Sequence, residues 1–132
     1  MTAGVKTVLI ADDEPEWRMR ASFLLSRSGE YSIETVADCE SVVERVERGG
    51  IDLLVLDNLM PGEEPFATGF DVCVHLKKQW PQLPIIFYTS AWQGVEVDRA
   101  ELEKQTGATV VLKIGRDSEL DDLAARAKAL LS

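Results

Sequence analysis

Short apolar runs alternate along this chain with longer segments of helical periodicity. The short runs are rich in Val, Ile, Leu and Phe, and three of them are continuous, as in strands buried on both faces of a sheet. The strands are predicted over Thr7–Ala11, Ser32–Val36, Asp52–Leu56, Pro84–Tyr88 and Thr109–Leu112. Strand and helix alternating five times favour an α/β fold with a parallel sheet and helices on both of its faces.

The segments between the strands carry apolar side chains at helical spacing, and most begin with a recognisable start signal. Pro is favoured in the first turn of a helix, whereas Asp, Ser and Thr cap its backbone N–H groups. The predicted start signals are Pro15, Asp38, the pair Thr68 and Asp71, and the pair Ser118 and Asp121. A weaker helix is predicted over Glu96–Gln105.

Composition narrows the possible functions. The 132 residues correspond to one domain, 1–132, with a short N-terminal tail over about residues 1–6. The net charge of −9 disfavours direct binding to nucleic acid or to an anionic membrane surface. Because the chain has no signal-peptide core and no apolar run near the ~18 residues of a membrane span, we expect a cytoplasmic protein. Cys39 and Cys73 lack metal-ligand spacing and are expected to be reduced packing residues.

Polar side chains follow four of the five predicted strands. The carboxyl ends of parallel strands lie along one edge of a sheet, where ligands of open α/β folds bind. The residues at these ends are Asp12, Asp13 and Glu14 after the first strand, Asp57 after the third, Thr89 and Ser90 after the fourth, and Lys113 after the fifth. Each could merely cap its strand or a helix, but their convergence on one edge favours a shared site.

The chemistry of this set points to phosphoryl transfer. Three crowded carboxylates repel one another unless cations offset their charge, and Lys113 supplies one positive charge. Mg²⁺ suits one or two carboxylates together with waters and a phosphoryl oxygen. An aspartate can also accept a phosphoryl group covalently. A metal on one side and a hydroxyl and an ammonium on the other would stabilise the transferring group.

Four segments of the chain resemble the receiver domain of two-component response regulators, and the resemblance extends over nearly its whole length. They are Val8–Glu14 with its acidic pair, Leu54–Gly62 around Asp57, Pro84–Ala91 around Thr89, and Gly107–Lys113. Each motif alone is weak, but all four occur in order and at suitable spacing. The resemblance implies a flavodoxin-like (βα)5 fold with strand order 2-1-3-4-5.

The resemblance also implies roles for the acidic residues. Asp57 would accept a phosphoryl group from the phosphohistidine of a sensor histidine kinase or phosphotransfer protein. Asp12 and Asp13, with Asp57 and the backbone carbonyl of Leu59, would hold Mg²⁺ directly or through water. The chain would then be a signalling phosphoacceptor in a phosphorelay rather than a conventional enzyme.

Further residues are implied to contact the phosphoryl group or to report its presence. Lys113 would pair with the phosphoryl oxygens, and Thr89 would turn its hydroxyl toward them. The backbone amides of Asn58 and Ser90 would be additional donors. Phosphorylation would thereby change which partners the domain binds.

Three features depart from the family pattern. Val110 occupies the position of the usual switch aromatic, and Ile114 stands where proline usually follows the lysine. Because a cis bond before a residue other than proline costs roughly 2.5–4 kcal/mol, we expect a trans Lys113–Ile114 bond. The loop Gly62–Gly69 is longer than usual. Its two glutamates and Phe66 are expected beside the site, where they could select a kinase or limit access, or the loop could simply be solvated. Phosphorylation is therefore expected to survive, with atypical signal transmission.

Other functions remain open at this stage. The chain could be a pseudo-receiver that binds partners independently of phosphorylation, although the complete acidic, hydroxyl and lysine set argues against this. An aspartyl phosphatase of the haloacid dehalogenase type would need Asp-x-Asp after the first strand, which Asp12-Asp13-Glu14 does not provide. The cognate kinase, the output partner, a homodimer and the presence of further domains are not determined by the sequence.

Overall fold

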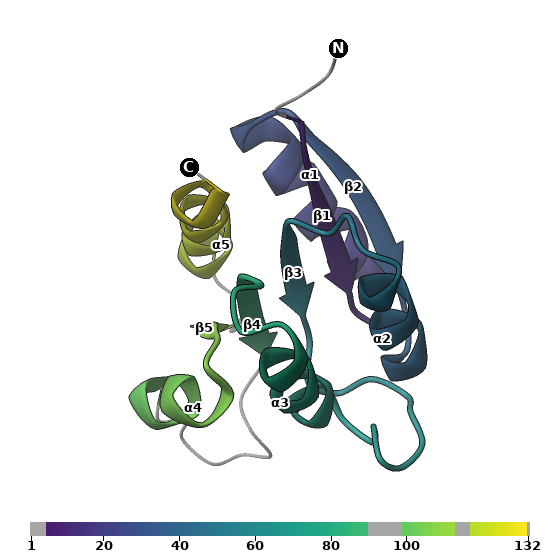
Figure 1. The fold of residues 1–132 in the computed structure, drawn as a ribbon. Helices are drawn as coiled ribbons and strands as arrows, with labels where there is room; N and C mark the ends of the chain where they lie inside the picture. Colours follow the sequence, from purple (N-terminus) through teal and green to yellow (C-terminus); the bar gives the residue numbers. More distant parts are fainter. Residues whose placement is uncertain (1–4, 90–98, 113–116, 132) are drawn as a thin grey trace.

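The computed structural model of the chain describes residues 5–89, 99–112 and 117–131, in which parallel strands alternate with helices (Figure 1). The strands are β1 (Lys6–Ala11), β2 (Tyr31–Val36), β3 (Leu53–Leu56), β4 (Ile85–Thr89) and β5 (Thr109–Leu112). The helices are α1 (Pro15–Ser28), α2 (Cys39–Glu47), α3 (Gly69–Gln79), α4 (Arg99–Thr106) and α5 (Asp117–Leu131).

The sheet has the order β2-β1-β3-β4-β5, and every neighbouring pair is parallel. This confirms the flavodoxin-like α/β fold. The register aligns Ala11 of β1 with Leu56 of β3, and Leu56 with Phe87 of β4. The residues that follow these three positions are therefore brought to one edge, as expected for the carboxyl ends of parallel strands.

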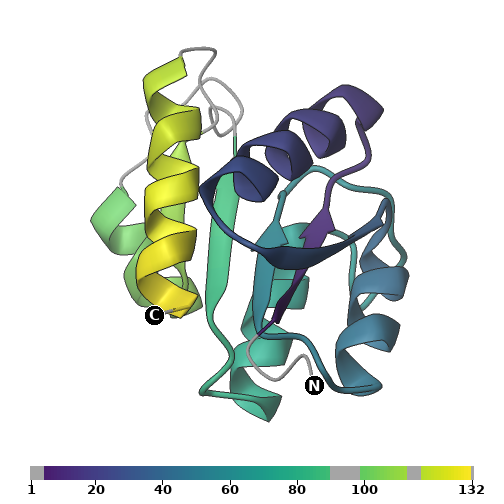
Figure 2. The ribbon, with the colours of Figure 1, turned by 90° about the horizontal axis from the view of Figure 1, so that it is seen from above.

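Two hydrophobic cores cover the two faces of the sheet. Alternate residues of each strand point to opposite faces. In β1, Leu9 and Ala11 join the core beneath α2, α3 and α4, whereas Val8 and Ile10 join the core beneath α1 and α5. Figure 2 shows α5, in yellow, alongside β4, with which it is in contact. Burial on both faces explains the continuous apolar runs of β1 and β3.

The predicted caps are confirmed for two helices and revised for a third. The side chain of Asp38 accepts from the backbone N–H of Ser41, and Thr68 with Asp71 forms a reciprocal capping box. The last helix begins at Asp117, so Ser118 lies inside it and is not the N-cap that we predicted. Helix α4 begins at Arg99; residues 96–98 of its predicted range lie outside the described residues.

The helices of the described chain do not include a membrane span. None of them combines the length and the apolar character that crossing a bilayer requires.

The start of α3 lies tightly against the end of β3. The backbone N–H of Gly69 donates to the carbonyl of Asn58 over 2.7 Å. A Cβ atom at Gly69 would lie 1.9 Å from the carbonyl oxygen of Asp57 and 2.9 Å from the Cα of Asn58. Both neighbours are backbone atoms, so they cannot yield as a flexible side chain would. Glycine at this position therefore lets α3 approach the strand end.

An ion pair joins α2 to the edge strand β2. The guanidinium of Arg45 donates to both carboxylate oxygens of Glu34, over 2.7 Å from Nε and 3.0 Å from Nη2. A third bond, from Nη1, reaches the carbonyl of Gly49 over 2.8 Å. The hydrogen bond from Arg45 holds the pKa of Glu34 below its ordinary value.

The Glu34→Gln substitution should lower the free energy of unfolding at neutral pH by up to about 1 kcal/mol, because half of a surface ion pair is lost. Since the folded state lowers the pKa of Glu34, this contribution exists above the ordinary value of 4.5 and disappears as pH falls through the lowered pKa. Urea unfolding of both proteins from pH 7 to pH 3 measures it.

The control for this comparison is Glu47→Gln, which makes the same charge change on the exposed side of α2. A difference between Glu34→Gln and the wild type that stays constant down to pH 3 would contradict the ion-pair interpretation.

The Gly69→Ala substitution should lower the free energy of unfolding by about 1–3 kcal/mol, because the added methyl group overlaps the backbone of Asp57 and Asn58 after β3 and forces it to move. Chemical denaturation measures the loss. In Thr68→Ala, one residue earlier, only a helix cap is lost, at a cost of about 1 kcal/mol. An alanine variant at residue 69 as stable as the wild type would show that the close approach imposes no constraint.

Candidate functional site

Three carboxylates converge at the carboxyl edge of the sheet. Asp12 and Asp13 follow β1, Asp57 follows β3, and one oxygen of each lies within 4.8 Å of the others. Asp12 is fully buried and Asp57 is 4% exposed, whereas Asp13 faces solvent. The cluster has the oxygen-rich, partly open character of a site for a hard divalent cation.

Asp12 accepts hydrogen bonds from three parts of the fold. Its Oδ1 accepts from the backbone N–H of Glu14 over 2.9 Å, and its Oδ2 accepts from the hydroxyl of Tyr88 over 2.5 Å. Its backbone carbonyl accepts from Nη1 of Arg18 on α1 over 2.7 Å. Donors from β4, from α1 and from the turn after β1 therefore surround this residue.

The contact with Tyr88 is not predicted by the sequence pattern, in which this residue is only the last position of a predicted strand. Tyr88 is 1% exposed, and burial, reinforced by the negative charge of Asp12, raises the pKa of its phenol above the ordinary value. The phenol therefore stays protonated and acts as a donor. A signal was present, because a tyrosine in a buried strand needs a partner for its hydroxyl.

The backbone after β3 is fixed on both sides of Asp57. The N–H of Asp57 donates to the carbonyl of Ala11 over 2.9 Å. The side chain of the buried Asn58 accepts from the N–H of Phe70 in the first turn of α3, over 3.0 Å. Leu59 follows with 57% of its surface exposed. Asp57 thus lies at a strand end whose backbone is hydrogen-bonded, and the first residue open to solvent, Leu59, comes two positions later.

Several expected site residues lie outside the described residues or are described only in part. The backbone of Thr89 belongs to β4 and pairs with Leu112, which brings it to the same edge, but its side chain is not described. Ser90, Lys113 and Ile114 lie outside the described residues, so the trans peptide after Lys113 stays a prediction.

Val110, the residue expected at the switch position, is part of the core. Val110 is 1% exposed and belongs to the core beneath α2, α3 and α4. Its backbone N–H donates to the carboxylate of Glu103 on α4 over 2.9 Å. A small β-branched side chain in this setting has no room to alternate between inward and outward positions.

The long loop after β3 is anchored rather than loosely solvated. Phe66 packs against the core beneath α2 and α3, and its ring meets that of His75 edge-on with 4.9 Å between centroids. The backbone N–H of Glu63 donates to the carboxylate of Glu40 on α2 over 2.9 Å. The loop is therefore held against α2 and α3.

Both cysteines are buried and free, in agreement with the packing role expected for them. Burial raises the pKa of the Cys39 thiol to about 11 and that of Cys73 to about 12. Because the thiolate is the reactive form, neither thiol is a nucleophile at neutral pH.

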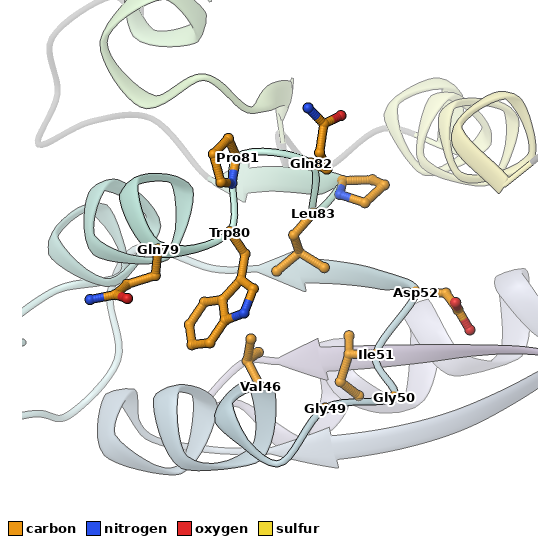
Figure 3. Close-up of a pocket in the computed structure, with 11 residues that line it drawn as sticks. Val46, Gly49, Gly50, Ile51, Asp52, Gln79, Trp80, Pro81, Gln82 and Leu83 are labelled. Atoms are coloured by element: carbon orange, nitrogen blue, oxygen red, sulfur yellow. The ribbon is translucent and has the colours of Figure 1, made fainter.

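A hollow of about 500 Å³ lies at the opposite end of the sheet, near the amino ends of β3 and β4 (Figure 3). The indole of Trp80 and the side chain of Leu83 point toward Val46 and Ile51 across it. Its position is remote from the carboxyl edge, where ligands of open parallel sheets bind. We therefore place the functional site at the acidic cluster.

A match to a known family covers most of the chain. The model of the response regulator receiver domain matches residues 8–125. The transcriptional regulatory protein TcrA of Mycobacterium tuberculosis is 34% identical over 129 residues, which cover 97% of this chain and 46% of TcrA. PhoP of Bacillus subtilis, an alkaline phosphatase synthesis regulator, is 30% identical over 96% of this chain and 48% of PhoP. The chain thus spans about half the length of these relatives.

Solved structures show the same fold. The response regulator protein TrrA of Thermotoga maritima, solved with Mg²⁺ and BeF, is 28% identical with a TM-score of 0.76. The two chains cover 96% and 99% of each other. The receiver domain of NtrX from Brucella abortus gives a TM-score of 0.76 at 24% identity, over 94% of this chain and 97% of that one. With the acidic cluster at the expected edge, the chain belongs to the response regulator receiver domain family.

Proposed function

We propose that this domain accepts a phosphoryl group on Asp57 and changes its partner binding as a result. The observation that carries the proposal is the convergence of Asp12, Asp13 and Asp57 within 4.8 Å at the carboxyl edge of a receiver fold. The three carboxylates fit a divalent cation and a carboxylate acceptor better than a capping role, because caps do not require mutual proximity.

The transfer follows from the chemistry of a carboxylate nucleophile. An oxygen of Asp57 attacks the phosphorus of a phosphohistidine, the P–N bond breaks, and its electron pair returns to the imidazole nitrogen. Hydrolysis of the acyl phosphate by water later restores the carboxylate and releases inorganic phosphate. The hydrogen bond from the N–H of Asp57 to Ala11 keeps the attacking residue at a fixed strand end.

Asp12, Asp13 and Asp57, with the backbone carbonyl of Leu59, are the proposed ligands of Mg²⁺, directly or through water. When bound, Mg²⁺ supplies the positive charge that offsets the carboxylates and the incoming phosphoryl oxygens. TrrA, of the same fold, was solved with Mg²⁺ and BeF, which supports this assignment.

Four further residues complete the proposed site. Lys113 pairs with the phosphoryl oxygens, and Thr89 turns its hydroxyl toward them. The backbone N–H groups of Asn58 and Ser90 donate to the same oxygens. The place of Thr89 in this group is supported by its position, because Thr89 is the last residue of β4 and pairs with Leu112 of β5 at the carboxyl edge.

The proposed partners are a sensor histidine kinase or a phosphotransfer protein on the input side and an unidentified partner on the output side. We propose that residues 1–132 act as one receiver domain in the cytoplasm, without direct contact to nucleic acid or membrane. The matched relatives are about twice as long as this chain. We therefore count a further domain of the same protein among the candidate output partners.

Signal output is proposed to differ from the usual mechanism. Val110 is buried where a switch aromatic usually stands, and Ile114 replaces the proline after Lys113. These departures favour one alternative, a pseudo-receiver that binds partners without phosphorylation. The acidic cluster favours the phosphoacceptor. The two functions differ in whether Asp57 accepts a phosphoryl group, which can be measured.

Incubation with beryllium fluoride and Mg²⁺ should form a stable adduct, and acetyl phosphate with Mg²⁺ should add one phosphoryl group to Asp57. Mass spectrometry counts the added group and locates it by peptide mapping. The Asp57→Asn substitution should abolish labelling, because the nucleophilic carboxylate is gone.

Asp52→Asn is the matched control, since it makes the same change at the opposite end of β3, where the carboxylate accepts from the N–H of Thr7. This variant should be labelled like the wild type. Labelling that persists in Asp57→Asn, or a wild type that forms no adduct, would exclude Asp57 as the acceptor; the second result would favour the pseudo-receiver.

A further inference from the structure

A tyrosine of β4 is linked to the acidic cluster across an intervening strand. Ala11, Leu56 and Phe87 are in register, so the next residues, Asp12, Asp57 and Tyr88, continue one row over three adjacent strands. They share the strand face of Ile10, Val55 and Ile86, which is the face covered by α1 and α5. The hydroxyl of Tyr88 therefore reaches Asp12 from two strands away, on the side of the sheet where Asp57 lies.

This bond and the one from the turn after β1 define the orientation of the Asp12 carboxylate. Oδ2 accepts from the phenol of Tyr88, and Oδ1 accepts from the N–H of Glu14. A carboxylate has about four acceptor positions, so accepting these two bonds does not by itself prevent it from binding a cation or a metal-bound water. Rotation of the carboxylate would break one bond or both.

Packing alone does not explain a tyrosine here. A phenylalanine would fill nearly the same volume in the core beneath α1 and α5, as the neighbouring Phe87 does on the opposite face. The hydroxyl adds a polar atom to a side chain that is 1% exposed, which is unfavourable without a partner. Its hydroxyl donates to Asp12, a residue of the acidic cluster.

We propose that Tyr88 is a positioning residue of the divalent-cation site, which holds the Asp12 carboxylate in the orientation that the cation requires. The proposal rests on the proposed function, because it assumes that the cluster binds Mg²⁺. Partners that orient metal-binding side chains commonly change metal affinity about 10–100-fold when they are removed. It also gives β4, which carries Thr89, a direct connection to the metal-binding strand β1.

The test is a Mg²⁺ titration of the unphosphorylated protein by isothermal titration calorimetry. The Tyr88→Phe variant should bind Mg²⁺ roughly tenfold more weakly than the wild type, because the ring is kept and only the orienting donor is lost. Ile86→Val is the control, since it trims a buried side chain on the same strand and the same face. It should lower the thermal stability without changing the Mg²⁺ dissociation constant.

A double-mutant cycle separates action through Asp12 from a general disturbance. In an Asp12→Asn background, Tyr88→Phe should change the remaining Mg²⁺ affinity by less than about twofold, because coupled residues are not additive. A full tenfold loss in that background would show that Tyr88 does not act through Asp12 and would overturn the proposal.

A measurement on the wild type avoids any effect of substitution on folding. The chain has two tyrosines, so tyrosine-labelled protein gives two sets of ring signals in an NMR spectrum. Mg²⁺ should shift the signals of Tyr88 and leave those of Tyr31, at the amino end of β2, in place. Tyr88 signals that do not move at saturating Mg²⁺ would overturn the proposal.

The outcomes distinguish this inference from the proposed function. A wild type that binds no Mg²⁺ overturns both. If Tyr88→Phe binds Mg²⁺ as tightly as the wild type, the positioning role alone is overturned. The same holds if Tyr88→Phe and Ile86→Val weaken Mg²⁺ binding equally. A selective loss in Tyr88→Phe that vanishes in the Asp12→Asn background supports it.

Discussion

Crowding of negative charge at one edge of the sheet is the constraint on which the rest of the structure depends. Asp12 and Asp57 are both buried, and the register of β1 and β3 forces them to be neighbours. Two unit charges at 4.8 Å repel by on the order of 3 kcal/mol at an effective dielectric constant of 20. A fold that keeps such a pair must supply donors or cations at this edge.

The described residues supply donors from several elements. The N–H of Glu14 and the hydroxyl of Tyr88 hold the side chain of Asp12, while Arg18 of α1 contacts its carbonyl. Asn58 is tied in turn to the first turn of α3. Tyr88 lies on β4 and Arg18 on α1, and both of these elements pack against the core beneath α1 and α5. The orientation of the acidic groups therefore depends on the packing of both faces of the sheet.

The two faces of the sheet differ in how their side chains contact the acidic cluster. Val8, Ile10 and Tyr88 belong to the core beneath α1 and α5, so this face contacts the acidic cluster through Asp12. Val110 belongs to the opposite core, where its backbone N–H donates to the carboxylate of Glu103 on α4. A link from the site to the α1 and α5 face through β4 is therefore built into the side chains of this protein, independently of the residue at position 110.

The sequence by itself determined the order and kind of the elements, because continuous apolar strands and helical stripes have different periods. It also determined that Asp12, Asp13 and Asp57 meet at one edge, because parallel strands share their direction. Local caps at Asp38 and Thr68 followed from the preferences of adjacent residues. The start of α5 did not, since Ser118 has the composition of a cap but lies within the helix.

Only the tertiary structure decided which side chains complete the site. The hydroxyl of Tyr88 donates to a residue 76 positions earlier in the chain, and no local sequence pattern predicts a contact across that separation. The same is true of Gly69, whose missing side chain leaves room for the carbonyl of Asp57. Phe66 lies in the loop after β3, and only the structure shows that it packs against the core. Periodicity specifies the face on which a residue lies, whereas contacts between strands and helices depend on register and packing, which are properties of the whole fold.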